Sequence, residues 1–310
     1  MSTVAKLRRQ TDTEGASAKL RQAIGSLGEV REPGDAEEPI LAPNVRRALF
    51  GWLAEIRAAD ELKAVGLIPR TTALAVGPPG CGKTTLAHHL AARLGVPMVV
   101  VGPETILGKY LGESEKSVAR LFAALAEADC PALLFMDEFD SLGGKRKGDV
   151  QSGAGEARLA TLTVLLRKVE EHRGYMIAAT NRPDGIDPAM WRRFHMQISV
   201  DLPGPEERFA ILKRYGLPFA FGDDDLDLLA SLTPGASPAL LRGLMENMKR
   251  ALVVGDKIGW PIHDPVALVE TILVALKPPP EIQPPPLWSD RAKRQELRAL
   301  AWPPSRPEAA

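Results

Sequence analysis

Short apolar runs alternate with amphipathic segments through the middle of the chain. Between the apolar runs, hydrophobic residues recur at helical spacing, as Val118, Leu121 and Leu125 do. The pattern predicts strands over 72–76, 98–101, 132–136, 175–179 and 196–200, and helices over 44–62, 85–94, 117–128 and 156–171. Strands that alternate with helices form a mostly parallel sheet covered on both faces. We therefore expect an α/β fold with a parallel five-stranded sheet.

The pattern changes after Pro205, where the strand-like runs stop. Helical spacing continues over 206–215, 226–232, 238–253 and 265–276. Two of these segments begin with Ser237-Pro238 and Asp264-Pro265, where a capping side chain precedes a first-turn proline. The sequence therefore predicts a second, all-helical domain.

Both ends of the chain have a different composition. Residues 1–39 mix charged and small residues, which predicts a flexible arm with at most a marginal helix over 16–27. From Lys277 the chain becomes proline-rich and then basic, which predicts a spacer or tail. The expected parts are the arm 1–39, an α/β domain 40–203, a helical domain 204–277 and a proline-rich tail 278–310.

Charge and cysteine content narrow the classes of function. The 310 residues include 39 Lys and Arg against 39 Asp and Glu, so no net charge attracts nucleic acid or an anionic membrane. Cys81 and Cys130 are too few for a disulfide framework and indicate free thiols. No early apolar stretch resembles a signal peptide, and no run approaches the roughly 18 residues of a spanning helix. We therefore expect a cytoplasmic protein without a membrane segment.

The segment LAVGPPGCGKTT follows a predicted strand and precedes a predicted helix. It satisfies G-x-x-x-x-G-K-[ST] at Gly77, Gly82, Lys83 and Thr84. Glycines let several backbone N–H groups and the helix N-terminus meet a β-phosphate, while the lysine bridges the β- and γ-phosphates. A plain glycine-rich turn is the alternative, and the full spacing argues against it. The residues expected to contact ATP are Gly77, Pro78, Pro79, Gly80, Cys81, Gly82, Lys83, Thr84 and Thr85.

Two carboxylates end the apolar run ALLFM. Asp137 and Glu138 lie where parallel sheets bind ligands, at the carboxyl end of a buried strand. With Thr84, Asp137 is expected to hold Mg²⁺, and Glu138 to polarise the attacking water. Paired acids can also simply solvate a strand end. Hydrolysis is favoured because a phosphate loop needs a separate group to orient the nucleophile.

Five segments, in this order, resemble the AAA clade of AAA+ ATPases over roughly residues 40–275: GPPGCGKTT, GKYLGESEK, LLFMDEFDSL, AATNRPDGIDPAMWRRF and GASPALLRGL. The short WRRF element looks more like the katanin and spastin form, and like stand-alone bacterial relatives, than the membrane-anchored proteases. The resemblance implies a P-loop NTPase domain followed by a helical lid.

The resemblance also implies roles for single residues. Asn181 matches sensor 1, which helps to place the attacking water; a turn-capping asparagine is the alternative. Arg192 and Arg193 match arginine fingers, which reach the nucleotide of a neighbouring subunit; the alternative is a surface pair near a helix end. Fingers that act in trans imply a homo-oligomeric ring, in this family a hexamer.

Further matches concern the pore and the lid. Lys109, Tyr110 and Leu111 match the pore loop that grips an extended polypeptide, although a tyrosine folded into the core is possible. Residues 143–156 match the second pore loop, and Gly235 and Ala239 match the segment near adenine and ribose. Arg242 is the candidate for sensor 2.

These observations favour a Mg²⁺-dependent ATPase that remodels, unfolds or threads protein substrates through a ring. One alternative is a nucleic-acid motor, which the neutral charge disfavours although Tyr110 could stack on bases. Another is a nucleotide-gated scaffold that regulates a partner enzyme such as a protease. Trp288 and the basic residues after it could dock a partner, or could belong to a disordered tail.

Overall fold

The computed structural model describes residues 17–108, 112–142, 153–280 and 282–305, the side chains of residues 153–158 excepted. The chain forms two compact units. The first, here called the sheet unit, comprises the described parts of residues 1–39, 44–77 and 83–200. The second, the helical unit, comprises those of residues 40–43, 78–82 and 201–310. Each unit has its own hydrophobic core.

The sheet unit is built on six strands in the order β1-β3-β4-β5-β2-β6. The strands are β1 Glu29–Arg31, β2 Thr72–Val76, β3 Met98–Val101, β4 Leu133–Met136, β5 Tyr175–Thr180 and β6 Met196–Ser199. All five predicted strands are present and parallel, and β1 adds an antiparallel edge. The parallel strands bring the ends of β2, β4 and β5 to one edge of the sheet.

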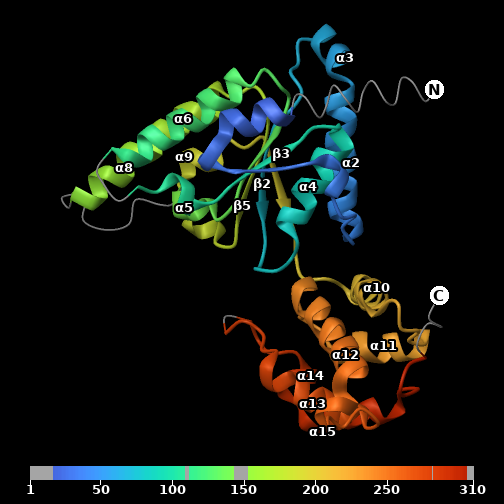
Figure 1. Cartoon of the computed structure of the whole chain (residues 1–310). Coiled ribbons are helices and arrows are strands. Elements are labelled where there is room, and N and C mark those ends of the chain that lie inside the picture. Colours follow the sequence, from blue (N-terminus) through green and yellow to red (C-terminus); the bar gives the residue numbers. More distant parts are fainter. Residues whose placement is uncertain (1–16, 109–111, 143–152, 281, 306–310) are drawn as a thin grey trace. The chain divides into compact units, whose positions relative to one another are not determined.

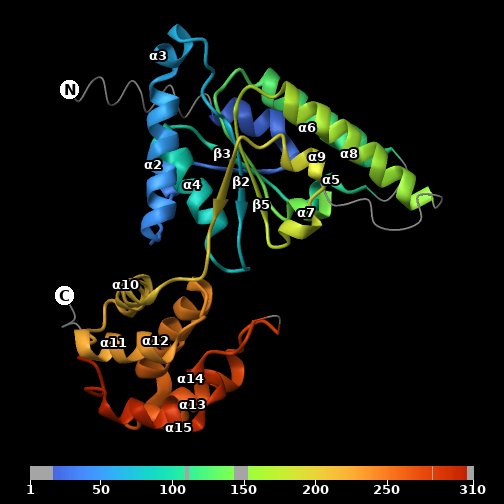
Figure 2. The same cartoon turned by 180° about the vertical axis from the view of Figure 1, so that it is seen from behind.

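Helices cover both faces of this sheet. α2 and α4 lie on one face, and α6 and α8 lie on the other (Figures 1 and 2). Large apolar side chains such as Leu121, Leu134 and Leu165 fill the core beneath α6 and α8. The helices are α2 Pro43–Arg57, α3 Ala59–Ala64, α4 Lys83–Leu94, α5 Pro103–Ile106, α6 Glu113–Glu127, α7 Phe139–Leu142, α8 Gly153–Glu171 and α9 Pro188–Trp191.

The helix allowed over 16–27 is present, but the flexible arm predicted around it is wrong for residues 17–39. A helix over 17–24 buries Leu20 and Ile24 in the core of the sheet unit. β1 then pairs with β3. Gly28, just before β1, lies so close to β3 that a Cβ there would be 2.8 Å from the Val100 carbonyl oxygen. The His88 ring Nε2 donates to the Glu32 carbonyl at 2.7 Å. The segment is ordered because the sheet edge satisfies its backbone while the core takes its few apolar residues.

The helical unit contains α10 Pro205–Gly216, α11 Asp223–Leu232, α12 Pro238–Ile258, α13 Pro265–Ala275, α14 Pro286–Ser289 and α15 Arg291–Arg294, with 3₁₀ turn η4 Gln295–Ala299. Both predicted caps are confirmed. The Ser237 hydroxyl accepts from the Leu240 N–H at 3.3 Å, and the Asp264 carboxylate accepts from the Val266 N–H at 2.9 Å. These caps set the first turns of α12 and α13.

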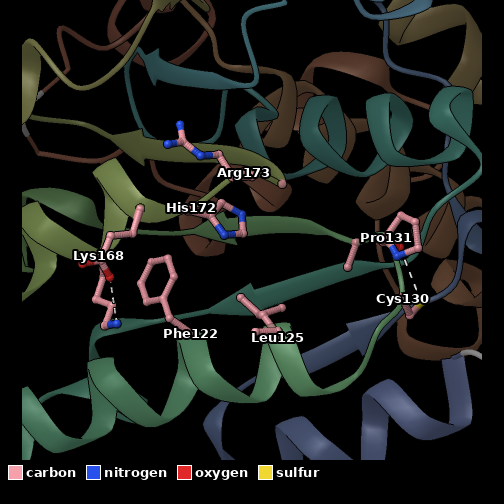
Figure 3. A pocket seen from close by; sticks show the side chains of 11 residues that line it. Phe122, Leu125, Cys130, Pro131, Lys168, His172 and Arg173 are labelled. Carbon is pink, nitrogen blue, oxygen red and sulfur yellow. Dashed lines mark hydrogen bonds and ion pairs between the residues drawn. The ribbon is translucent and has the colours of Figure 1, made fainter. Parts of the chain in front are cut away.

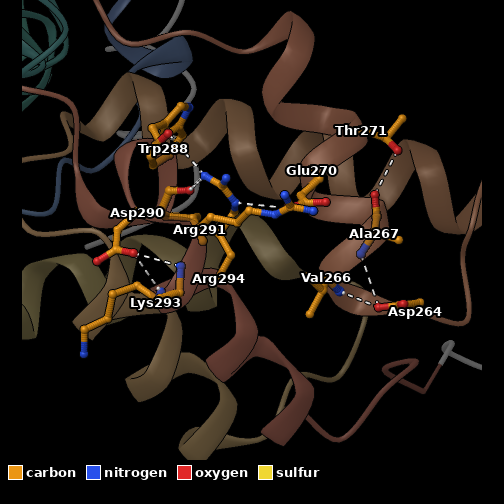
Figure 4. A network of polar contacts seen from close by, with 12 residues as sticks. Asp264, Val266, Ala267, Glu270, Thr271, Trp288, Asp290, Arg291, Lys293 and Arg294 are labelled. Carbon is orange, nitrogen blue, oxygen red and sulfur yellow. Dashed lines mark hydrogen bonds and ion pairs between the residues drawn. The ribbon is translucent and has the colours of Figure 1, made fainter.

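The segment predicted as a tail packs on the helical unit over residues 285–304. Leu287 and Leu297 are fully buried, and the Trp288 indole donates to the Leu276 carbonyl at 2.7 Å. Arg294 donates to the carbonyls of Leu287 and Trp288 (Figure 4). The prediction of a disordered tail is therefore wrong. The prediction of Trp288 as a partner anchor is also wrong, because Trp288 packs and hydrogen-bonds within its own unit.

None of the helices in the described part of the chain combines the length and the apolar character needed to cross a membrane.

The docking of residues 17–39 can be tested by its contribution to stability. We expect Leu20→Ala to lower the free energy of unfolding by about 2–5 kcal/mol, because it removes fully buried methyl groups. The neighbouring exposed Lys19→Ala is the matched control and should change it by less than about 0.5 kcal/mol. Urea denaturation measures both, and equal stability of the two variants would contradict the docked helix.

Candidate functional site

The phosphate-loop lysine joins two elements at the carboxyl edge of the sheet. The Lys83 ammonium, on a side chain that is only 7% exposed, donates to the Gly77 carbonyl at 2.8 Å and to the Asn181 side-chain oxygen at 2.6 Å. Gly77 directly follows β2, and a Cβ there would lie 2.0 Å from the Val200 carbonyl oxygen, so no other residue fits. The structure thus brings together the predicted lysine and the predicted sensor 1.

The rest of the loop, residues 78–82, lies within the helical unit. The Ala239 N–H donates to the Gly80 carbonyl at 3.2 Å. Gly80 has φ +75°, and a Cβ there would lie 3.0 Å from the Ser237 hydroxyl and from the Ala239 Cβ. Gly235 has φ +79° and precedes the capped start of α12. Of the two residues predicted near adenine, Ala239 therefore touches the phosphate loop, while Gly235 provides the turn.

The remaining loop positions differ in exposure. Pro79 and Gly80 are exposed, Pro78 is half-buried, and the Cys81 side chain is 7% exposed. Gly82 has φ +86°, a conformation that favours glycine, and Thr85 lies half-buried in the first turn of α4.

The predicted magnesium ligands lie side by side. The Thr84 hydroxyl, in the first turn of α4, donates to the Asp137 carboxylate at 3.4 Å. Asp137 follows β4, and its N–H donates to the Val101 carbonyl of β3 at 2.9 Å. Among the described residues, no group of three or more His, Cys, Asp or Glu could hold a metal. One hydroxyl and one carboxylate suit Mg²⁺, which keeps waters and binds substrate phosphates.

Glu138 has a strained backbone. Its φ is +45°, in the left-handed region, and its N–H donates to the Asp137 carboxylate at 2.9 Å. This conformation costs a non-glycine residue about 1–2 kcal/mol. Strain of this kind clusters at functional sites, where surrounding structure maintains it. The Glu138 side chain is exposed at the strand edge, where a general base would meet water.

Sequence reasoning missed two residues that hold the Asn181 turn. The Thr180 hydroxyl donates to the Asp140 carboxylate at 2.8 Å and accepts from the Arg182 N–H at 2.9 Å. The Asn181 side-chain oxygen accepts from Lys83, and no side-chain hydrogen bond caps the 3₁₀ turn that follows, whose N-cap residue is Arg182. Asp140 is the third acid of the segment MDEFD, so the sequence did contain a signal for it. Only the pairing of β4 with β5 brings this acid within reach of the Thr180 hydroxyl.

The two arginines predicted as fingers have different surroundings. Arg193 donates to the Ala189 carbonyl at 3.0 Å and forms an ion pair with Glu170 of α8 at 2.6 Å. Its Nε atom is buried and has no hydrogen-bond partner. Arg192 is exposed, and the structure shows no side-chain partner for it among the described residues. Within one chain, therefore, Arg193 is engaged by Glu170, and Arg192 is the exposed member of the pair.

The sensor 2 candidate, Arg242, is engaged on its own helix. Its Nε donates to Glu246 at 2.7 Å, and its guanidinium lies 5.1 Å from the centre of the Tyr215 ring. The sensor 2 role of Arg242 stays a prediction.

The predicted pore residues Lys109, Tyr110 and Leu111 lie outside the described residues, as do residues 143–152 of the second predicted pore loop. The flanking Gly108 donates its N–H to the Ser114 hydroxyl at 3.0 Å. Gly112 has φ +81° and precedes α6. The pore role of these residues stays a prediction.

Comparison with known proteins gives the family. The model of the ATPase family associated with various cellular activities (AAA) matches residues 73–202, which include the phosphate loop, Asp137, Glu138 and Asn181. Residues 73–202 are an AAA ATPase domain. The resemblance drawn from the five motifs is thereby confirmed.

Curated relatives match a longer part of the chain. The proteasome-activating nucleotidase of Pyrococcus furiosus is 38% identical over 222 residues, which cover 67% of this chain and 56% of that protein. The ATP-dependent zinc metalloprotease FtsH of Hahella chejuensis is 34% identical over 209 residues, covering 65% of this chain and 33% of that protein. The chain spans about half the length of the nucleotidases it matches.

The fold of the AAA domain also matches a solved structure. The crystal structure of the FIGL-1 AAA domain aligns with a TM-score of 0.66 and 22% identity, covering 91% of this chain and 93% of that one. This match confirms the predicted fold class, an α/β domain followed by helices.

The strain at Glu138 can be measured by two substitutions. We expect Glu138→Gly to be more stable than Glu138→Ala by about 1 kcal/mol, because glycine accepts φ +45° without steric cost. At the exposed Arg120 in the middle of α6, the order should reverse by a similar amount. Urea denaturation of the four variants gives the comparison, and the same order at both positions would rule out strain.

Proposed function

We propose that the chain hydrolyses ATP with Mg²⁺ at the carboxyl edge of its sheet. The observation that carries this proposal is the cluster in which Lys83 contacts Asn181 while Thr84 contacts Asp137. Three separate parts of the sequence supply these side chains, and each is the type that phosphoryl transfer requires.

Each residue in the cluster has a role that follows from its chemistry. Lys83 would exchange its contact with the Gly77 carbonyl for phosphate oxygens, and Thr84 with Asp137 would hold the metal and its waters. Magnesium would neutralise charge on the β- and γ-phosphates. The Glu138 carboxylate would polarise the attacking water, and Asn181 would orient it.

The same proposal extends to assembly and to substrate. The exposed Arg192 suits an arginine finger that completes the site of a neighbouring copy, which makes the active form a ring, by family resemblance a hexamer. Tyr110 would grip an extended protein substrate in the central pore. A cytoplasmic location accords with Cys81 and Cys130, neither of which forms a disulfide.

A second candidate function is regulation of a partner peptidase. It is favoured by the relatives' names, since one group is called proteasome-activating and FtsH is called an ATP-dependent protease. In that case the nucleotide-bound assembly would act on the partner, and hydrolysis would reset it. Nucleic acid is the less favoured substrate, because positive and negative side chains balance.

Replacing the proposed base tests the ATPase. We expect Glu138→Gln to lower kcat by roughly a hundredfold or more while the protein still binds ATP, because the water loses its base and the phosphate loop is unchanged. Lys83→Ala should instead lose ATP binding. Phosphate release measures the rate, and a fluorescent ATP analogue measures binding. A Glu138→Gln variant that turns over at the wild-type rate would sink the proposal.

Replacing the proposed pore residue tests threading. We expect Tyr110→Ala to keep ATP hydrolysis but to lose unfolding of a fluorescent protein that carries an unstructured peptide extension, because the aromatic contact is missing. Tyr110→Phe should retain unfolding, since the ring supplies the apolar grip. Loss of fluorescence with ATP is the readout. If Tyr110→Ala unfolds the probe as well as the wild type, the pore does not depend on this side chain.

A further inference from the structure

A cavity of about 440 Å³ opens beside Arg192 in the sheet unit. Its walls come from three stretches of chain: residues 68–72 leading into β2, residues 169–173 at the end of α8, and residues 192–195 leading into β6. Four arginines line it, namely Arg70, Arg173, Arg192 and Arg193, against one carboxylate, Glu170. Positive charge therefore dominates the cavity.

Two of these four arginines already have anionic partners. Arg70 donates two side-chain hydrogen bonds to Glu55, at 2.8 and 2.6 Å, and this carboxylate raises the pKa of Arg70. Arg193 is held by Glu170. Arg173 and Arg192 are exposed and have no side-chain partner among the described residues. Two exposed guanidinium groups that line one cavity without a carboxylate partner are available to bind the same anion.

We propose that Arg173 and Arg192 together receive the terminal phosphate of the ATP bound by a second copy of the chain, and that Arg193 is a positioning residue. This inference rests on the proposed ATPase function. It assigns Arg173, in place of Arg193, as the partner of Arg192. A planar guanidinium binds phosphate oxygens through paired N–H donors and is always charged. Two of them can neutralise the charge that spreads over the γ-phosphate oxygens during transfer.

The turn that carries Arg173 is held by packing. The preceding His172 packs edge-on against Phe122, with ring centres 5.5 Å apart. The following Gly174 leaves room for the imidazole, since a Cβ there would lie 2.8 Å from the His172 Nε2. Arg173 points away from Phe122 (Figure 3), and both His172 and Arg173 line a second cavity between α6 and α8 as well as this one. Burial lowers the pKa of His172 and so favours the neutral imidazole beside Arg173.

Arg193 suits a positioning role because of its two contacts. Its pair with Glu170 ties the end of α8 to the segment after α9, and its bond to the Ala189 carbonyl closes the last turn of α9. Arg192 lies directly before it in the chain. Holding Arg193 inward leaves Arg192 outward, on the side of the cavity that Arg173 shares.

The first test compares steady-state ATPase of three single variants. We expect Arg173→Ala and Arg192→Ala each to lower kcat by about tenfold or more with little change in KM, because each chain's own phosphate loop binds ATP. Arg193→Ala should lower Tm as well as kcat, whereas Arg173→Ala should leave Tm unchanged because its side chain is exposed. Arg167→Ala is the matched control, since Arg167 is an exposed arginine on α8 outside the cavity. A wild-type kcat for Arg173→Ala overturns the proposal.

The second test asks whether Arg173 acts across copies. Arg173→Ala is mixed one to one with Lys83→Ala, which supplies the arginine but binds no nucleotide. If Arg173 acts in trans, roughly a quarter of the seams join a working phosphate loop to a working arginine, and the mixture regains activity that neither variant has alone. No gain on mixing, with mixed assembly shown by differently tagged chains, overturns the proposal. Arg173→Lys should recover part of the lost kcat, because it restores a charge without the planar fork.

Two further outcomes distinguish a free-anion site from a failure of the ATPase itself. If inorganic phosphate stabilises the Lys83→Ala protein and Arg173→Ala removes this effect in the double variant, the cavity takes a free anion and the proposal falls. If the wild-type protein hydrolyses no ATP, or if Glu138→Gln hydrolyses it normally, the ATPase function itself fails. The mixing result then does not apply, and the two failures are distinguishable.

Discussion

The contact of one ammonium group organises the site. Lys83 begins α4, yet its Nζ reaches the end of β2 and the turn after β5, where it meets Gly77 and Asn181. A buried ammonium must have polar partners, since leaving it without them would be strongly unfavourable. The need to satisfy this charge holds two strand ends and a helix start in one geometry. That geometry is the one in which phosphates could replace the carbonyl contact.

Backbone constraints act with this charge. Gly77 lies so close to the Val200 carbonyl that the strand end admits no side chain, and Glu138 keeps a left-handed conformation beside Asp137. The Thr180 hydroxyl, bonded to the Asp140 carboxylate and to the Arg182 N–H, fixes the turn that carries Asn181. The polar groups are therefore placed by close packing at the end of the parallel strands, and their positions depend little on the exposed loops.

Arg192 and Arg193 are the same type of residue, but their surroundings give them different roles. Arg192 and Arg193 differ by one position in the chain, but only Arg193 falls within reach of Glu170 at the end of α8. The ion pair is partly exposed and contributes modestly to stability. Its larger effect is geometric, because it commits one guanidinium to the fold and leaves its neighbour exposed. No sequence motif includes Arg173. It lies at the same cavity as Arg192 only because α8 ends there.

The sequence alone determined the five parallel strands, the helices between them, the phosphate loop and the acids that follow β4. These features are local: periodicity and spacing along the chain specify them, whatever lies opposite. It did not determine that residues 17–39 add β1 and a buried helix, that residues 285–304 pack on the helical unit, or that Arg193 is tied to Glu170. Each of these depends on a partner distant in the chain, and a three-residue strand or a single tryptophan carries too little local preference to indicate that partner. Only the tertiary structure, by bringing the sheet edge, the Leu276 carbonyl and the Glu170 carboxylate into reach, decided them.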